Sequence, residues 1–129
     1  MSLTNPAEQA ALEAVLTGTY IALFTDPPLE DGTGGTEVVG GGYARKSWTP
    51  SVTQGDPTVA TNTVTLAWSA TSNWGIISHA CVMDSAVGGT VIAVNELVDP
   101  NETSTPLPKE VNSGDDIQFS IGTFDVTME

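Results

Sequence analysis

The sequence predicts a mainly β fold: a compact β-sandwich or barrel-like domain of six to eight short strands with one short N-terminal helix. Three observations lead to this prediction. Short β-prone runs recur along the chain, and turn residues, among them 13 glycines and 8 prolines, separate them. Only 15% of the residues are charged, well below the roughly 25% of an ordinary soluble domain. This composition suits strands and tight turns better than salt-bridged helices.

Residues 1–18 are predicted to form the helix, as an N-terminal helix or arm. Asn5 has the residue type of an N-cap, Pro6 suits the first helical position, and Glu8 completes the spacing of a capping box. Gly18 is expected to end the helix. One apolar stripe is predicted along the helix, because its apolar residues are spaced three and four positions apart: Leu12, Val15 and Leu16.

Residues 19–129 are predicted to form the β-domain, so that the whole chain, 1–129, is a single domain. The strand candidates are 19–25, 43–49, 62–69, 75–84, 89–97, 116–121 and 123–128. The nearly apolar segment 75–84 is expected to be a central strand, and 116–121 and 123–128 a terminal hairpin around Gly122.

Aromatic residues are expected to fill the core of this small domain. In the segment 62–69, alternation predicts one buried face, formed by Val64, Leu66 and Trp68. The tryptophans Trp48, Trp68 and Trp74 leave a second interpretation open, a binding module in which they stack on sugars.

The charge is strongly unbalanced, with 16 acidic and 3 basic residues and a net charge of −13. Such a surface repels phosphate groups, so we expect neither nucleic-acid nor membrane binding. It favours solubility, or contact with a basic partner. Cys81 is the only cysteine, so an intrachain disulfide is excluded. The N-terminus does not have the pattern of a signal peptide, and no apolar run is long enough to span a membrane.

The segment 35–50, GTEVVGGGYARKSWTP, raises the question of an anion-binding loop. A phosphate motif needs a helix after its glycines, whereas this block continues with an alternating, strand-like pattern. We therefore predict a mobile loop, 26–42, that leads into a strand in which Tyr43 and Trp48 are apolar anchors. Arg45 and Lys46 alternate across that strand, and the outward one is expected to pair with an acidic group.

No catalytic residue, cofactor site or metal site is predicted, and the chain is not expected to be an enzyme. The sole histidine, His79, and Cys81 would share one face of a strand with Ile77 and Met83. A Cys–His nucleophile pair is the functional alternative to a core or interface histidine. A calcium site at an acidic loop is another alternative, but the pair Asp115 and Asp116 reads as a turn before a strand.

Four segments together resemble a family of small tailed-bacteriophage virion proteins, known as head-decoration or tail fibre proteins. The resemblance covers nearly the whole chain, and its segments are YIALFTDPP, GTEVVGGGYARKSWT, NWGIISHACVMDSAVGG and VNSGDDIQFSIGTFDVTM. The family block often has Gln where this chain has Lys46, and an apolar residue where it has Ser47.

The resemblance implies a structural protein of the phage particle, made in the host bacterial cytoplasm and located on the virion surface. We expect a capsid decoration (cement) protein that binds between major capsid protein subunits. The alternative is a tail-associated component, as part of a fibre, tip or tube that takes part in host attachment. A homo-oligomer, such as a trimer, is expected in either case, with subunit contacts through Tyr43, Arg45 and Lys46.

Overall fold

The computed structural model describes residues 4–55, 57–99 and 102–128, which contain one helix and fourteen strands. The helix is α1 (Asn5–Leu16). The strands are β1 (Tyr20–Asp26), β2 (Thr36–Glu37), β3 (Lys46–Ser47), β4 (Pro50–Thr53), β5 (Thr58–Asn62), β6 (Leu66–Ser69), β7 (Gly75–Ile77), β8 (His79–Met83), β9 (Val91–Glu96), β10 (Val98–Asp99), β11 (Glu102–Pro106), β12 (Lys109–Val111), β13 (Asp116–Phe119) and β14 (Asp125–Met128). The predicted mainly β class is confirmed, although short strands are more numerous than the six to eight expected.

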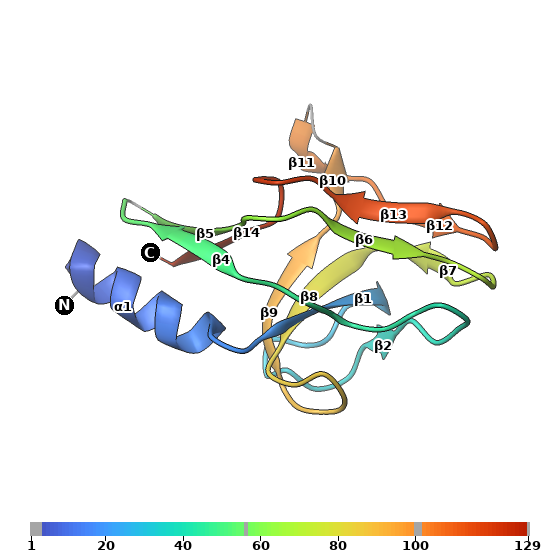
Figure 1. Cartoon of the computed structure of the whole chain (residues 1–129), viewed down its shortest axis with the longest axis horizontal. Coiled ribbons are helices and arrows are strands. Elements are labelled where there is room, and N and C mark those ends of the chain that lie inside the picture. Colours follow the sequence, from blue (N-terminus) through green and yellow to red (C-terminus); the bar gives the residue numbers. More distant parts are fainter. Residues whose placement is uncertain (1–3, 56, 100–101, 129) are drawn as a thin grey trace.

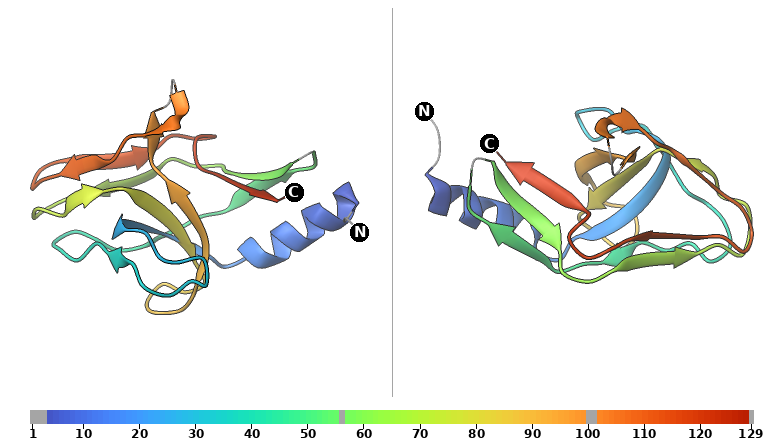
Figure 2. Two further views of the ribbon diagram at one scale, coloured as in Figure 1. Left: turned by 180° about the vertical axis from the view of Figure 1, so that it is seen from behind. Right: turned by 90° about the horizontal axis from the view of Figure 1, so that it is seen from above.

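The strands form a sandwich-like arrangement of two layers (Figures 1 and 2). One layer is the antiparallel sheet β2-β1-β8-β9, to which β3 adds by pairing with β1. The other layer consists of three small sheets, β4-β5-β14, β6-β13 and β7-β12. The main core contains side chains of both layers, such as Ile21 and Val82 from the first and Leu66 and Trp68 from the second. Strand β8 is central, because it pairs with both β1 and β9.

The predicted strand 75–84 is interrupted at Ser78, whose hydroxyl donates to the carbonyl of Thr25 at 3.0 Å. Because of this break, Ile77 belongs to the main core while Cys81 and Met83 belong to a second cluster with Ala22. The expectation that Ile77 shares a face with Cys81 is therefore wrong.

Helix α1 begins one residue earlier than the sequence predicts. Its N-cap is Thr4, whose hydroxyl accepts from the amide of Ala7 at 3.4 Å. Glu8 is thus not part of a capping box; its carboxylate instead accepts from the Thr58 hydroxyl at 3.1 Å and ties the helix to β5. The helix ends as predicted, with Gly18 at a φ of 71° just beyond the cap residue Thr17.

The buried stripe of α1 consists of fewer apolar residues than expected. Leu12 and Leu16 are in the main core, but Val15 is 47% exposed. The helix packs mainly on β4 and β5 at one end of the molecule (Figure 1). No helix of the described residues is long and apolar enough to cross a membrane.

The predicted terminal hairpin is wrong. Strand β13 pairs with β6 and β14 pairs with β5, so the two last strands lie in different sheets. Asn62, fully buried at the end of β5, holds the loop between them: its amide donates to the carbonyls of Val64 and Ser120, and its oxygen accepts from the amide of Phe124 at 2.9 Å. A side chain far away in sequence thus anchors the segment that connects β13 to β14.

The core position of the three tryptophans is confirmed, since Trp48, Trp68 and Trp74 are all buried. Their indole N–H groups all donate within the chain, to Thr19 Oγ1, Ala44 O and Gly41 O respectively. Val64, in contrast, is 52% exposed rather than buried with Leu66, because β5 ends at Asn62 and β6 begins only at Leu66.

Candidate functional site

The glycine block 40–42 is packed against the segment 69–74 rather than mobile. Trp74 Nε1 donates to the carbonyl of Gly41 at 3.0 Å, and Thr71 N donates to the same carbonyl at 3.1 Å. Gly42 has a φ of 82°, and a Cβ placed there would lie 2.5 Å from the carbonyl oxygen of Ser69. The glycines therefore permit a close approach of two backbone segments, and the prediction of a mobile loop is wrong for this part of 26–42.

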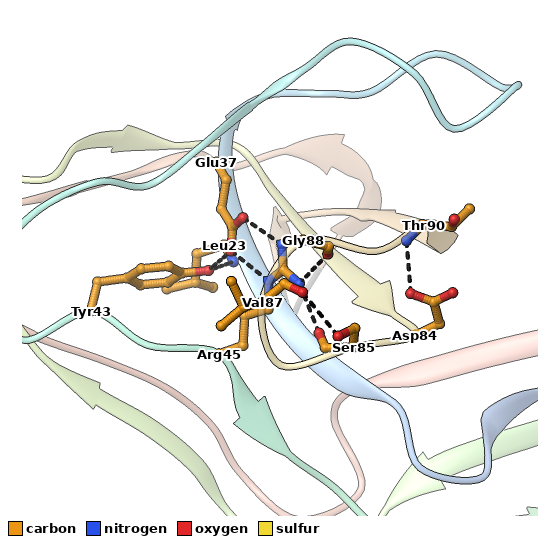
Figure 3. A network of polar contacts seen from close by, with 9 residues as sticks. All are labelled: Leu23, Glu37, Tyr43, Arg45, Asp84, Ser85, Val87, Gly88 and Thr90. Carbon is orange, nitrogen blue, oxygen red and sulfur yellow. Dashed lines mark hydrogen bonds and ion pairs between the residues drawn. The ribbon is translucent and has the colours of Figure 1, made fainter.

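The block positions Arg45 in a polar network that is enclosed by the chain itself (Figure 3). The Arg45 guanidinium contacts Glu37 twice, with Nη2–Oε1 at 2.8 Å and Nε–Oε2 at 2.9 Å. Its Nη1 donates to the carbonyls of Ser85 at 2.7 Å and Gly88 at 2.6 Å. Arg45 thus joins the segment after β1 to the turn between β8 and β9, and its side chain is only 8% exposed.

Tyr43 completes this network. Its hydroxyl donates to Glu37 Oε2 and accepts from the amide of Leu23 at 3.1 Å. Its ring meets Trp74 edge to face, with centroids 5.6 Å apart. The carboxylate of Glu37 therefore receives hydrogen bonds from both Tyr43 and Arg45, which fixes its orientation.

The electrostatics of the network favour one charge state. Burial alone would raise the pKa of Glu37, but the hydrogen bonds from Arg45 and Tyr43 and the positive charge of Arg45 outweigh it, and the pKa lies below its usual value of 4.5. Burial and the hydrogen bond to Glu37 raise the pKa of the Tyr43 hydroxyl. Glu37 is consequently ionised and Tyr43 neutral near pH 7. Glu37 and Arg45 then form an ion pair, and the Tyr43 hydroxyl donates a hydrogen bond to the carboxylate of that pair.

The sequence singled out Tyr43, Arg45 and Lys46 as subunit contacts. The structure brings Tyr43 and Arg45 together in the network, whereas Lys46 lies exposed on β3, next to Ile21 of β1. The enclosed residue, Arg45, pairs with Glu37 within the chain, and the expected pair of the outward residue, Lys46, with an acidic neighbour stays a prediction. A contact of these residues with another subunit stays a prediction.

His79 and Cys81 lie on one face of β8, as their spacing predicts, but they differ in burial. Cys81 is fully buried, and this burial raises the pKa of its thiol to about 12. Since the thiolate is the nucleophilic form, Cys81 is a poor nucleophile at neutral pH. His79 Nδ1 lies 2.7 Å from Ser78 Oγ, and Nε2 lies 4.0 Å from a carboxylate oxygen of Glu96.

The acidic loops are arranged as turns. Asp115 Oδ2 accepts from the amide of Asn112 at 2.9 Å, which confirms the predicted turn before β13. Asp31 accepts from the amide and the hydroxyl of Thr33 at 3.0 and 2.6 Å. Within residues 4–55, 57–99 and 102–128, no group of three or more His, Cys, Asp or Glu side chains is placed to hold a metal ion.

A groove that the sequence analysis missed opens where β9 passes β13 and the β13–β14 loop. This β9–β13 groove has a volume of about 980 Å³. Its lining residues are Ala80, Asn95, Glu96, Leu97, Val98, Leu107, Pro108, Lys109, Glu110, Ile117, Gln118, Phe119, Ser120, Gly122, Thr123, Phe124 and Asp125. Because these come from five separate segments, only the tertiary arrangement reveals the groove.

The fold and these sites define a class of protein. The chain is a small β-sandwich-like domain in which most basic and aromatic side chains make contacts within the chain itself. The family model described as "Podophage GP4 fiber I protein gp80" matches residues 3–127. The chain therefore belongs to this family of phage fibre proteins, and the predicted resemblance to a tailed-phage virion protein is confirmed. No curated protein and no solved structure matches the chain.

Proposed function

We propose that this chain is a non-catalytic structural subunit of a phage tail fibre or of its attachment to the tail. The observation that carries the proposal is the family match over residues 3–127, which names a fibre protein. It supports the tail-associated alternative of the sequence analysis better than its first choice, a capsid decoration protein.

The fold suggests the part such a subunit plays. A fibre shaft needs a repeated or coiled-coil element that extends along an axis, whereas the described residues of this chain form a sandwich-like domain with a single helix of 12 residues. We infer that the domain acts as a joint or a cap that binds other fibre or tail subunits. Symmetric contact with further copies of itself is the usual arrangement in such assemblies.

The tryptophans support a role in assembly rather than in sugar binding. A stacking site needs an exposed ring face, but Trp48, Trp68 and Trp74 are buried and their N–H groups donate within the chain. Attachment to the host would therefore depend on the subunits that this domain connects.

Labelling intact virions with gold-coupled antibodies against this chain tests the proposal, together with its copy number per particle from quantitative mass spectrometry. We expect label on the fibres and a low copy number that is a multiple of the fibre symmetry. Label spread over the head, with copies in the hundreds, would overturn the tail assignment in favour of capsid decoration.

The proposal that the subunit has no catalytic role has a separate test. His79→Ala and Cys81→Ala variants that remain folded should assemble into virions with normal infectivity. A folded variant that assembles normally but loses infectivity would contradict it.

A further inference from the structure

The β9–β13 groove lies beside the outer edges of β9 and β13, with which no further strand of the described residues pairs. Within the part of the chain that the structure describes, β8 is the only strand that pairs with β9, and β6 is the only strand that pairs with β13. Figure 1 shows β9 rising toward β10, where the end of β13 passes it. An unpaired edge presents a row of backbone donors and acceptors that a further strand can satisfy.

The register identifies which backbone groups of β9 are free. The amide of Leu97 donates to the carbonyl of Ser78 at 2.9 Å, and the same register pairs Asn95 with Ala80. Because hydrogen-bonded and non-hydrogen-bonded pairs alternate in an antiparallel ladder, the backbone groups of Val94 and Glu96 point away from β8. Both residues thus offer an N–H and a C=O at the open edge.

The surroundings suit an extended chain with apolar side chains. In the groove lining, Leu107 is 51% exposed and Phe119 is half-buried, whereas Ile117 and Phe124 are buried in the main core; on β9, Ile92 and Val94 are 38% and 39% exposed. An added strand would place alternate side chains in the groove and beside this exposed pair, as in peptide recognition by β-augmentation. Across the groove, Asn95 Nδ2 donates to the carbonyl of Asp125 at 2.8 Å and joins the two walls.

Charge indicates the nature of the partner. The groove is lined by three carboxylates, of Glu96, Glu110 and Asp125, and by one ammonium, of Lys109. The Lys109 ammonium is engaged within the chain, because it donates to the carbonyl of Asp116 at 2.6 Å. A second copy of this chain is a poor match, since it has three basic residues in all and a net charge of −13.

We propose that the β9–β13 groove binds an extended, positively charged segment of a different virion subunit, which adds as a strand to the free edge of β9. The inference rests on the proposed function only in taking that partner to be a neighbour in the fibre or tail. The β9–β13 groove would then be the surface through which this domain, as a joint or a cap, binds its neighbour.

Photo-crosslinking in assembled virions tests the partner. A benzoylphenylalanine in place of Gln118, exposed on β13 within the groove, should crosslink to one segment of another virion protein, and that segment should be rich in Lys and Arg. The matched control places the same group at Val64, which is also exposed but outside the groove. Crosslinks from position 118 to a second copy, to an acidic segment or to nothing would overturn the proposal.

A proline substitution tests strand addition. In the chain with the crosslinker at position 118, Val94→Pro removes an outward N–H that β8 does not use, and edge strands tolerate proline at such positions. We expect it to lower the crosslinking yield about tenfold, since roughly one hydrogen bond and the fit of the partner strand are lost. Val94→Ile, which keeps both the N–H and the apolar side chain, should lower the yield much less than Val94→Pro does. An unchanged yield with Val94→Pro would contradict the proposal.

A charge reversal in the groove provides a second test if the proline variant does not fold. The double variant Glu96→Lys with Glu110→Lys changes only exposed side chains, and we expect it to lower the yield by a similar factor. An undiminished yield would rule out a basic partner. If the crosslinked partner is a head protein, the groove assignment stands while the tail proposal fails; if gold labels the fibres but position 118 gives no crosslink, only the groove assignment fails.

Discussion

Arg45 and Glu37 form a two-bond ion pair, with Nη2–Oε1 at 2.8 Å and Nε–Oε2 at 2.9 Å, in which the arginine side chain is almost completely enclosed. Arginine suits this position because its planar fork matches a carboxylate while the remaining nitrogen reaches other acceptors. Here that nitrogen holds two carbonyls of the β8–β9 turn, at Ser85 and Gly88. One side chain thus connects segments about forty residues apart in sequence.

Replacing Arg45 by Ala should destabilise the fold strongly. The substitution leaves the partly buried Glu37 carboxylate without its cation and two turn carbonyls without a donor, and we expect a loss of roughly 3 kcal/mol in the free energy of unfolding. Lys46→Ala is the matched control, since it removes an exposed cation one position along and should change stability by at most about 0.5 kcal/mol. Urea denaturation measures both. Equal losses in the two variants would show that the network does not stabilise the fold.

Acid should weaken the same network. The folded-state pKa of Glu37 is lowered, so the stability that its ionisation contributes is fully present above its unfolded-state value near 4.5 and is lost as the pH falls through the folded-state value. We therefore expect Glu37→Gln to be less stable than the wild-type chain at pH 7 and the difference to shrink below about pH 4. Thermal unfolding from pH 7 to pH 3 measures this. A difference that stays constant over that range would contradict the assignment.

The sequence predicted the local elements better than their partners. The strand at 19–25 and the glycine that ends α1 follow from residue types over a few positions, and both are found close to where they were expected. The interruption at Ser78 was missed because it depends on a hydrogen bond to Thr25, a contact with another strand. Strand propensity alone carries no information on such pairings.

For the candidate site, too, residue types were informative, whereas the partners of each residue could not be predicted. The scarcity of basic residues correctly drew attention to Arg45 and Lys46, but their alternation could not tell which one finds an acidic partner. That choice depends on where the β8–β9 turn lies, which is fixed by the sheet and not by the residues around position 45. The groove was missed altogether because its lining residues come together only in the folded chain.

Asn62→Ala should be among the most damaging polar substitutions. It removes donors from the carbonyls of Val64 and Ser120 and an acceptor from the buried amide of Phe124, and we expect a loss of roughly 3 kcal/mol. Asn73→Ala is the control, because Asn73 makes one exposed hydrogen bond, to the amide of Ser113, and should cost about 1 kcal/mol or less. Chemical denaturation of both variants compares them. Similar losses would mean that the loop 120–124 does not depend on Asn62.

Cys81 should be unreactive in the folded protein. Its side chain is fully buried and its thiol has a raised pKa of about 12, so both access and thiolate fraction are low. At pH 8 we expect a disulfide reagent to modify it at least about a hundredfold more slowly than in the urea-unfolded chain, whose thiol has an ordinary pKa near 8.5. The absorbance of the released chromophore follows the reaction. Comparable rates in the two states would show that β8 is open to solvent.

The glycine block offers a test that separates backbone strain from steric conflict. Gly42 and Gly114 both have positive φ, 82° and 92°, but a Cβ at Gly114 meets nothing within 4 Å, whereas at Gly42 it lies 2.5 Å from the Ser69 carbonyl oxygen. Gly114→Ala should therefore cost only the left-handed backbone conformation, about 1 kcal/mol. Gly42→Ala adds the conflict with a backbone atom that cannot rotate away, and we expect a loss larger by about 1–3 kcal/mol.

Thermal denaturation of the two variants measures this difference, and near-ultraviolet circular dichroism adds a local signal because Trp74 donates to the carbonyl of Gly41 within the same block. The Gly42 variant should lose part of the aromatic signal, and the Gly114 variant should keep it. If both variants lose the same stability and keep the same spectrum, the block is a tolerant loop. If they differ as expected, the glycines are required because two backbone segments meet there, and the position of Arg45 in its network depends on that contact.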